Sequence, residues 1–312
     1  MTSHPVWGSV WLRSAISTAI LVYLAFHIDI SASLTALLRV NPTHLIAVLV
    51  LVGLDRSLMI CRWLLLLRSS GQQIAVKSVA WIFLVSSFIG SVLPTSLGGD
   101  AARAYTLSRR TDDTSEAIAS VTIDRLSGVL SLALTATVGA VVWGTANDSL
   151  PVGVIWTIVV LAGLGCTSIL WIDRLLRDLI PNSWHESLRG AKLIRLADAL
   201  SRYRCRRPTL VGVFGLSVSV QLLRVVQAYL LGLGLGIDVN LSYYLVFMPI
   251  GLLMLLLPVS IAGFGLPQGV IVWLLRPQGV TDSLSFALST LIILTGLAGN
   301  IPGAWLYVRS KI

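Results

Sequence analysis

The hydrophobic pattern of the sequence consists of long apolar stretches separated by short polar segments. A helix needs roughly 20 mainly apolar residues to cross a bilayer, and several stretches reach this length with few or no charges. The pattern therefore predicts an all-α integral membrane protein rather than a soluble domain. We expect about six full spans, at residues 9–28, 43–67, 117–143, 151–172, 209–234 and 284–308.

Two further apolar segments, 76–110 and 243–276, each contain a Leu-Pro-x-Ser turn followed closely by glycines. Proline removes a helical hydrogen-bond donor and glycine permits unusual backbone angles, so a helix is expected to break at each turn. Such residues can also merely kink a membrane helix, but two turns in corresponding positions favour a functional break. The turn residues are Pro94, Ser96, Gly98 and Gly99 in the first segment, and Pro258, Ser260, Gly263 and Gly265 in the second.

The distribution of basic residues predicts the orientation, because cytoplasmic loops of membrane proteins are enriched in Lys and Arg. Segment 173–208 holds nine of them, whereas loops 144–150 and 235–242 hold none. Segment 173–208 and both termini are therefore expected on the cytoplasmic side of a bacterial-type inner membrane. This orientation requires segments 76–110 and 243–276 to enter and leave on one side, as re-entrant hairpins from opposite faces.

Each hairpin is the third element in a set of four, and the two sets have opposite predicted orientations. This arrangement is typical of inverted-repeat transporters, whose sites lie at broken helices near the bilayer midplane. We expect one transmembrane domain over residues 1–312, with repeats at about 1–146 and 147–312. The apolar positions within 188–203 fit a helix on the inner leaflet, and an ordinary solvated connector is the alternative.

Composition narrows the function classes. Hydrophobic residues make up 55% of the chain and charged residues 12%, against about a quarter charged in soluble proteins. The net charge of +9 is assigned to loops that face anionic lipid, so no nucleic-acid partner is expected. The cysteines and histidines show no metal-ligand spacing, and neither an ATP-binding loop nor a catalytic motif is present. We therefore expect no metal, no cofactor and no enzymatic activity.

Arg103 and Asp100 follow the first turn by a few residues. If a half-helix begins near Asp100, its free amides and positive dipole end would face the break. Arg103 would add a fixed positive charge, and together these features suit an anionic group such as a lipid phosphate. Asp100 would either cap this half-helix or pair with Arg103.

Charged residues also occur within predicted spans, where each is costly unless paired or hydrated. Asp124 and Arg125 lie in the third span, whose polar face would line a headgroup cavity or serve helix packing. Arg224 lies in the middle of the fifth span, and Asp55 of the second span is a potential partner for it. A purely structural ion pair is the alternative to a binding role.

These residues resemble the transmembrane domain of lysylphosphatidylglycerol synthases, whose free-standing members are called flippase-like proteins. The resemblance covers nearly the whole chain. It rests on Leu93-Pro94 through Gly98-Gly99-Asp100-x-x-Arg103, Asp124-Arg125-Leu126, Arg62-Trp63, and Pro258 with Gly263-Phe264-Gly265. The family usually has Glu where this chain has Asp124, and often a Glu after the second turn, where Gln268 stands nearby.

The resemblance implies lipid translocation without naming the lipid. From their positions near the breaks and within the spans, we expect Arg103, Arg125 and Arg224 to hold the headgroup, which would be anionic, glycosylated or aminoacylated. The sequence ends at Ile312 without the aminoacyl-transferase domain of the two-part relatives, so synthase activity is not expected. The alternatives are a polyprenyl-phosphate or glycolipid carrier, an intramembrane enzyme that uses Asp124 or Asp55, and a scaffold for a glycosyltransferase. Membrane lipids are the expected partners, together with a lipid-modifying enzyme or glycosyltransferase.

Overall fold

The computed structural model describes residues 29–93, 98–111, 113–144, 188–254 and 265–309, together with residues 153, 160, 163 and 164. Predicted span 9–28, most of span 151–172 and both Leu-Pro-x-Ser turns lie outside the described residues. Within those ranges the chain forms helices and no strand. The helices are α2 (Ile30–Leu38), α3 (Pro42–Ser69), α4 (Val76–Val92), α5 (Gly98–Thr111), α6 (Thr114–Gly144), α9 (Leu188–Cys205), α10 (Arg207–Gly234), α11 (Leu241–Met254), α12 (Leu266–Leu275), the 3-10 turn η2 (Arg276–Gln278), α13 (Asp282–Ala298) and α14 (Ile301–Arg309).

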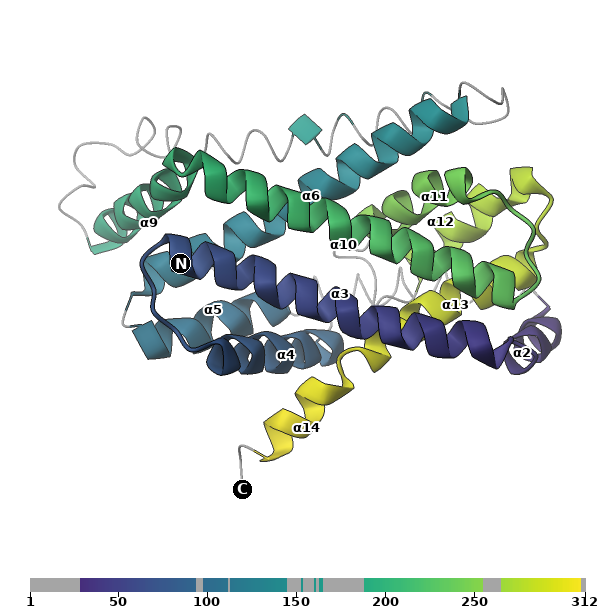
Figure 1. Cartoon of the computed structure of the whole chain (residues 1–312), viewed down its shortest axis with the longest axis horizontal. Coiled ribbons are helices and arrows are strands. Elements are labelled where there is room, and N and C mark those ends of the chain that lie inside the picture. The colour runs from purple at the N-terminus through teal and green to yellow at the C-terminus, as the bar shows by residue number, and fades with distance from the viewer. Residues whose placement is uncertain are drawn as a thin grey trace, which may run out of the picture.

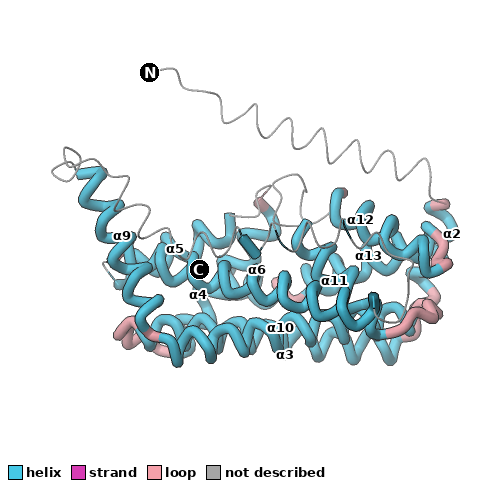
Figure 2. Tube along the Cα trace, turned by 90° about the horizontal axis from the view of Figure 1, so that it is seen from above, coloured by secondary structure: helices cyan, strands magenta, loops and turns pink. Residues whose placement is uncertain are grey.

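Four helical segments in the described part of the chain are long and apolar enough to cross a membrane: Pro42–Ser69, Thr114–Gly144, Arg207–Gly234 and Asp282–Arg309. They match four of the six predicted spans. Helices α3 and α10 lie side by side along most of their length, and α6 crosses behind them (Figure 1, Figure 2). The prediction of an all-α membrane fold is therefore confirmed.

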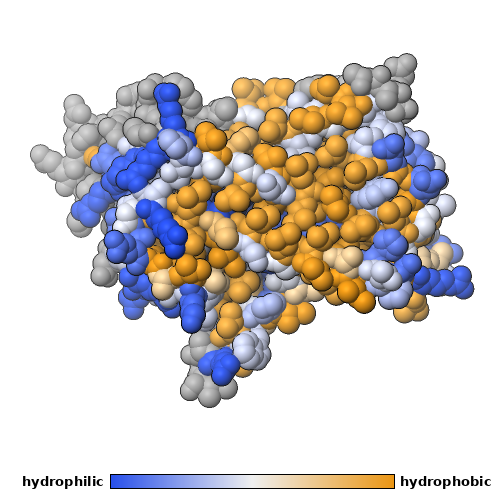
Figure 3. All heavy atoms as spheres, in the orientation of Figure 1, coloured by the Kyte–Doolittle hydropathy of each residue, from blue (hydrophilic) through white to orange (hydrophobic). Residues whose placement is uncertain are grey.

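The exterior matches a bilayer. Exposed apolar side chains, such as Ile46 and Val50 of α3 and Val211 and Leu222 of α10, form a wide band between two polar ends (Figure 3). One polar end collects exposed basic residues from the end of α3, the start of α4, the end of α5 and the start of α10. These residues are Arg68, Lys77, Arg109, Arg110, Arg206 and Arg207.

The first broken segment forms a helical hairpin. Helices α4 and α5 pack against each other, so the start of α4 and the end of α5 lie at the same end of the molecule (Figure 1). Both are shorter than a typical spanning helix. Near the tip of the hairpin, Gly90 of α4 lies against Gly99 of α5. A Cβ atom on Gly90 would lie 2.9 Å from the Cα of Gly99, so this close contact requires glycine. Helices α11 and α12 of the second broken segment also pack together. The placement of both hairpins in a membrane and the inverted-repeat symmetry stay predictions.

The last predicted span, 284–308, corresponds to the spanning segment Asp282–Arg309, but its helix is divided in two. Helix α13 ends at Ala298 and α14 begins at Ile301. The proline at position 302 has no N–H to donate to the carbonyl of Ala298, so the helical ladder is interrupted there. Asn300 lies at this break, and α14 turns away to pack on α4 (Figure 1).

Helix α9 occupies part of the basic segment 173–208 and packs against α6. Its Ala197 and Tyr203 are buried. Arg202 donates a hydrogen bond to Glu116 of α6 at 2.8 Å, and this bond raises the pKa of the Arg202 guanidinium. The described part of this segment is thus a docked helix rather than a fully solvated connector, and its contact with the inner leaflet stays a prediction.

Candidate functional site: an arginine-lined cavity

A cavity of about 480 Å³ opens among α3, α4, α5, α6, α10, α11 and α13. Its size is within the range of small-ligand sites, about 300–1,000 Å³. Among the described residues its lining includes five arginines and three aspartates, a formal excess of two positive charges. The charged residues form two clusters that share helix α3.

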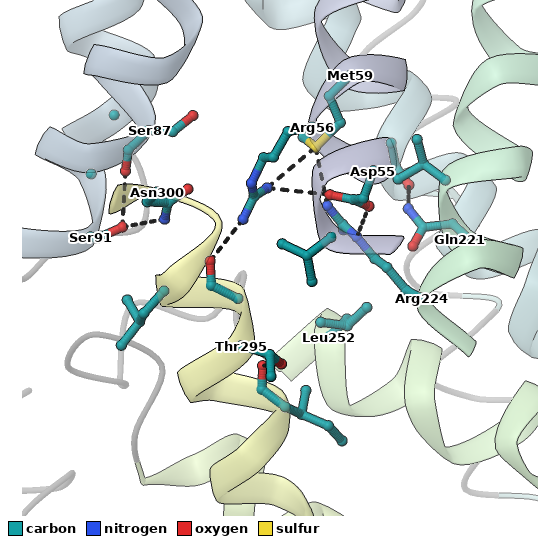
Figure 4. A pocket seen from close by; sticks show the side chains of 18 of the residues that line it. Asp55, Arg56, Met59, Ser87, Ser91, Gln221, Arg224, Leu252, Thr295 and Asn300 are labelled. Atoms are coloured by element: carbon teal, nitrogen blue, oxygen red, sulfur yellow. Dashed lines mark hydrogen bonds and ion pairs between the residues drawn. The ribbon is translucent and has the colours of Figure 1, made fainter. Parts of the chain in front are cut away.

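The Arg224 cluster consists of Asp55, Arg56 and Arg224 (Figure 4). Arg224 of α10 donates from Nε to Asp55 Oδ1 at 2.9 Å. Arg56 lies 3.4 Å from the other oxygen of the same carboxylate and also donates to the carbonyl of Gly296 at 3.0 Å. The side chains of Arg56 and Arg224 are 17% and 22% exposed, so both are less deeply buried than the carboxylate that they share, which is 5% exposed.

The Arg103 cluster consists of Arg62, Asp100, Arg103, Asp124 and Arg125. Asp124 accepts from Arg62 at 2.7 Å and pairs with Arg103 at 3.0 Å. Asp100 pairs with Arg103 at 3.1 Å and also with Arg125. Asp124, Arg62 and Arg103 have side chains no more than 6% exposed, whereas Arg125 is 29% exposed.

Aromatic rings complete the surroundings of Arg103. Its guanidinium carbon lies 5.1 Å from the centre of the Trp63 ring and 5.4 Å from that of Phe83. A cation above an aromatic face is attracted by the negative ring quadrupole. Arg103 is therefore fixed by two carboxylates and two rings, which explains how a charge is kept inside an apolar helical body.

The wall near α4 and α13 is polar but uncharged. We call Ser87, Ser91, Thr295 and Asn300 the neutral wall (Figure 4). Asn300 donates from Nδ2 to Ser91 Oγ at 2.5 Å, and Ser91 donates to the carbonyl of Ser87 at 2.9 Å. The cavity therefore presents guanidinium groups on one side, and hydroxyl and amide groups on the other.

The structure brings most of the described candidate residues together. The cavity lining includes six of them: Gly99, Asp100, Arg103, Asp124, Arg125 and Arg224. Gly98 starts α5, and Gly265 precedes α12 with a positive φ of 106°. Neither of these two described glycines lines the cavity. The candidates in the turns lie outside the described residues: Pro94, Ser96, Pro258, Ser260 and Gly263.

The open alternatives about ion pairing now have answers. Arg224 pairs with Asp55, the partner proposed for it. Asp124 of α6 pairs with Arg62 of α3 and Arg103 of α5. Asp100 pairs with Arg103. Gln268 is buried, where its Oε1 accepts from the Gly265 amide at 3.3 Å and its Nε2 donates to Thr290 at 3.0 Å. The glutamine thus stabilises the start of α12, away from the cavity lining.

Sequence reasoning did not assign Ser87, Ser91 or Asn300 to the site. Serine and asparagine are common enough in membrane helices to give little signal alone. The spacing of Ser87 and Ser91, one helical turn apart on the same face, was a usable indication. The described residues contain no group of three His, Cys, Asp or Glu side chains that could hold a metal ion.

No curated protein matches the chain at a significant level. The family model described as "Lysylphosphatidylglycerol synthase TM region" matches residues 10–303, which covers nearly the whole chain and all helices of the cavity. This is a lipid-related membrane family, in agreement with the apolar band and the four spanning segments. The chain therefore belongs to the lysylphosphatidylglycerol synthase transmembrane-region family.

Proposed function

We propose that this protein is a lipid translocator, which moves an anionic or glycosylated or aminoacylated headgroup between the two leaflets of a bacterial-type inner membrane. The observation that supports this most strongly is the cavity with five arginines and three aspartates inside an apolar helical body. Charges within the membrane are costly and usually mark a pathway for polar substrates. A positive excess favours an anionic substrate.

Partly exposed arginines would supply the positive charge and the hydrogen bonds that a phosphate loses when it leaves water. A phosphate in hydrocarbon loses its hydration at a cost of several kcal/mol. Arg224, Arg125 and Arg56 have side chains between 17% and 29% exposed, and arginine can bind phosphate through two parallel hydrogen bonds. The acyl chains need no polar path, because they can stay in the bilayer beside the cavity.

Alternating access would come from the two hairpins. Inverted-repeat transporters expose one central site to each side in turn by movement of one repeat against the other. In the proposed topology both termini are cytoplasmic and the hairpins enter from opposite faces. Transport would be passive or driven by an ion or the membrane potential. A lipid-modifying enzyme or a glycosyltransferase would supply or use the lipid.

The geometry favours transport over intramembrane catalysis by Asp55 or Asp124. Each of these carboxylates is shared between two guanidinium groups: Asp55 between Arg56 and Arg224, and Asp124 between Arg62 and Arg103. A carboxylate engaged in this way is a poor nucleophile and a poor base. A polyprenyl-phosphate or glycolipid carrier would use the same arginines, so it differs from our proposal only in the lipid carried.

The test is headgroup accessibility in liposomes reconstituted with the purified protein and without ATP. The labelled lipid should be the one that copurifies with the protein, identified by mass spectrometry. We expect transfer between leaflets well above that of empty liposomes, with the lipid chemically unchanged. Arg109→Ala should behave as wild type, because Arg109 is exposed and lies outside the cavity lining. Transfer equal to that of empty liposomes would contradict the proposal, and a covalently altered lipid would favour an enzyme.

A further inference from the structure

The aspartates of the cavity are all engaged by arginine. Asp55 pairs with Arg56 and Arg224. Asp100 pairs with Arg103 and Arg125. Asp124 pairs with Arg62 and Arg103. Each described carboxylate of the lining thus already has two cationic partners, and their charge disfavours the approach of a positively charged ligand.

Two amide oxygens in the cavity lining need a hydrogen-bond donor. Oδ1 of Asn300 and Oε1 of Gln221 are buried, and within the described part of the chain neither has a hydrogen-bond partner. Gln221 is only 3% exposed and uses its Nε2 to donate to Ser131 at 3.3 Å. A buried acceptor without a donor is unfavourable, so a ligand that brings donors would be stabilised here.

Hydroxyl and ammonium groups can both donate to an amide oxygen, and charge distinguishes them. The described lining carries two more arginines than aspartates, and Arg56 lies between Arg224 and the neutral wall (Figure 4). An ammonium group placed at Asn300 would lie in a positive field of low dielectric, where like charges repel strongly. A hydroxyl group donates without that repulsion.

We infer that the substrate is a phospholipid whose headgroup ends in an uncharged hydroxylated group, such as glycerol or a sugar, rather than in a cationic aminoacyl group. The phosphate is held by Arg224, Arg56 and Arg125. The hydroxyl groups bind Asn300 and Ser91 of the neutral wall and Gln221 on the opposite side. This inference narrows the proposed function and rests on the cavity being the headgroup site.

Lipid binding to the purified full chain in detergent, measured by native mass spectrometry or by ligand-induced thermal stabilisation, tests this specificity. The probes are phosphatidylglycerol, phosphatidic acid and lysylphosphatidylglycerol. Phosphatidylglycerol should bind about tenfold or more tightly than lysylphosphatidylglycerol, because the added ammonium groups meet the arginines. It should also bind more tightly than phosphatidic acid, which lacks the glycerol hydroxyls.

Two variants test the role of the neutral wall. Ser91→Ala should reduce the preference for phosphatidylglycerol over phosphatidic acid severalfold. Ser57→Ala is the matched control: both hydroxyls donate to a carbonyl of their own helix at 2.9 Å, but Ser57 is exposed and outside the lining. Asn300→Asp should raise the binding of lysylphosphatidylglycerol relative to phosphatidylglycerol, because it adds a carboxylate to the wall.

The outcomes separate this inference from the proposed function. Tighter or equal binding of lysylphosphatidylglycerol, no binding of phosphatidylglycerol, or unchanged preferences in a folded Ser91→Ala protein would overturn the inference. Transfer of lysylphosphatidylglycerol at a rate equal to that of phosphatidylglycerol would overturn it while leaving translocation intact. Selective binding of phosphatidylglycerol without transfer between leaflets would support the specificity and contradict the translocator.

Discussion

The two charged clusters of the cavity are built from the same residue types, but the core of the Arg103 cluster is more deeply buried than the arginines of the Arg224 cluster, while Arg125 at its edge is 29% exposed. In the Arg103 cluster, the side chains of Arg62, Arg103 and Asp124 are 2–6% exposed. In the Arg224 cluster, both arginines are 17–22% exposed. A buried ion pair is costly to break, whereas a partly exposed one can exchange partners. We conclude that the core of the Arg103 cluster holds helices α3, α5 and α6 together, and that the Arg224 cluster faces the substrate.

The largest effect on stability is expected from Asp124→Ala. This change removes the carboxylate that Arg62 and Arg103 share, while both guanidinium groups stay buried. Breaking a buried ion pair costs about 3–5 kcal/mol. Thermal unfolding of the purified protein in detergent should show a large decrease in melting temperature or loss of folded protein. A melting temperature equal to that of wild type would contradict the structural role of this cluster.

The next largest effect is expected from Gly99→Ala, which acts on the Arg103 cluster through the backbone. A Cβ atom at this position would lie 2.9 Å from the carbonyl oxygen of Ser86. Helix α5 would have to shift away from α4, at a cost of about 1–3 kcal/mol, and Asp100 would move with it. Gly53→Ala is the matched control near Asp55, since no atom lies within 4 Å of its Cβ position. Equal melting temperatures for the two variants would show that the hairpin contact does not matter.

Arg224→Ala should destabilise the protein less than Asp124→Ala. The remaining Asp55 keeps Arg56 as a partner, so this change leaves no described buried charge of the cluster unpaired. The comparison of the two melting temperatures tests the distinction between the clusters directly. A larger decrease for Arg224→Ala would reverse their assigned roles.

The smallest effect is expected from Arg276→Ala, which gives the baseline for an ion pair at the polar end of the molecule. Arg276 binds Asp282 through two hydrogen bonds, at 2.8 and 2.7 Å, and its side chain is 51% exposed. Exposed pairs contribute about 0–1 kcal/mol. The melting temperature should stay near that of wild type. A decrease as large as that of Asp124→Ala would show that burial does not explain the different contributions of the ion pairs to stability.

Several charged members of the site were predictable from the sequence. Asp124 and Arg224 each interrupt an apolar stretch, Arg103 follows the first Leu-Pro-x-Ser turn by a few residues, and Asp55 was proposed as the partner of Arg224. The roles of the clusters were not predictable, because burial depends on how the α4–α5 hairpin packs against α3 and α6. Sequence periodicity within one helix contains no information about that packing.

The fold, like the site, was predictable from the sequence only in part. Apolar length identified the long helices, and proline with glycine correctly divided each broken segment into two helices, α4 and α5 in the first and α11 and α12 in the second. The division of the last span at Asn300 was missed, although Pro302 was visible in the sequence, because proline is tolerated in many membrane helices. The neutral wall was missed for a related reason: Ser91 and Asn300 come from distant segments that only the tertiary structure brings together.

The central claim is that a lipid headgroup crosses the membrane through this cavity in contact with the Arg224 cluster. The most direct measurement is the rate of headgroup transfer in liposomes per folded protein, with the copurifying lipid, for wild type, Arg224→Lys, Arg224→Ala and Arg109→Ala. We predict the wild-type transfer rate for Arg109→Ala. Arg224→Lys should keep part of the transfer rate, because lysine keeps the charge but loses the planar fork. Arg224→Ala should lower the rate about tenfold or more. Folded Arg224→Ala protein that transfers the lipid at the wild-type rate would contradict the account.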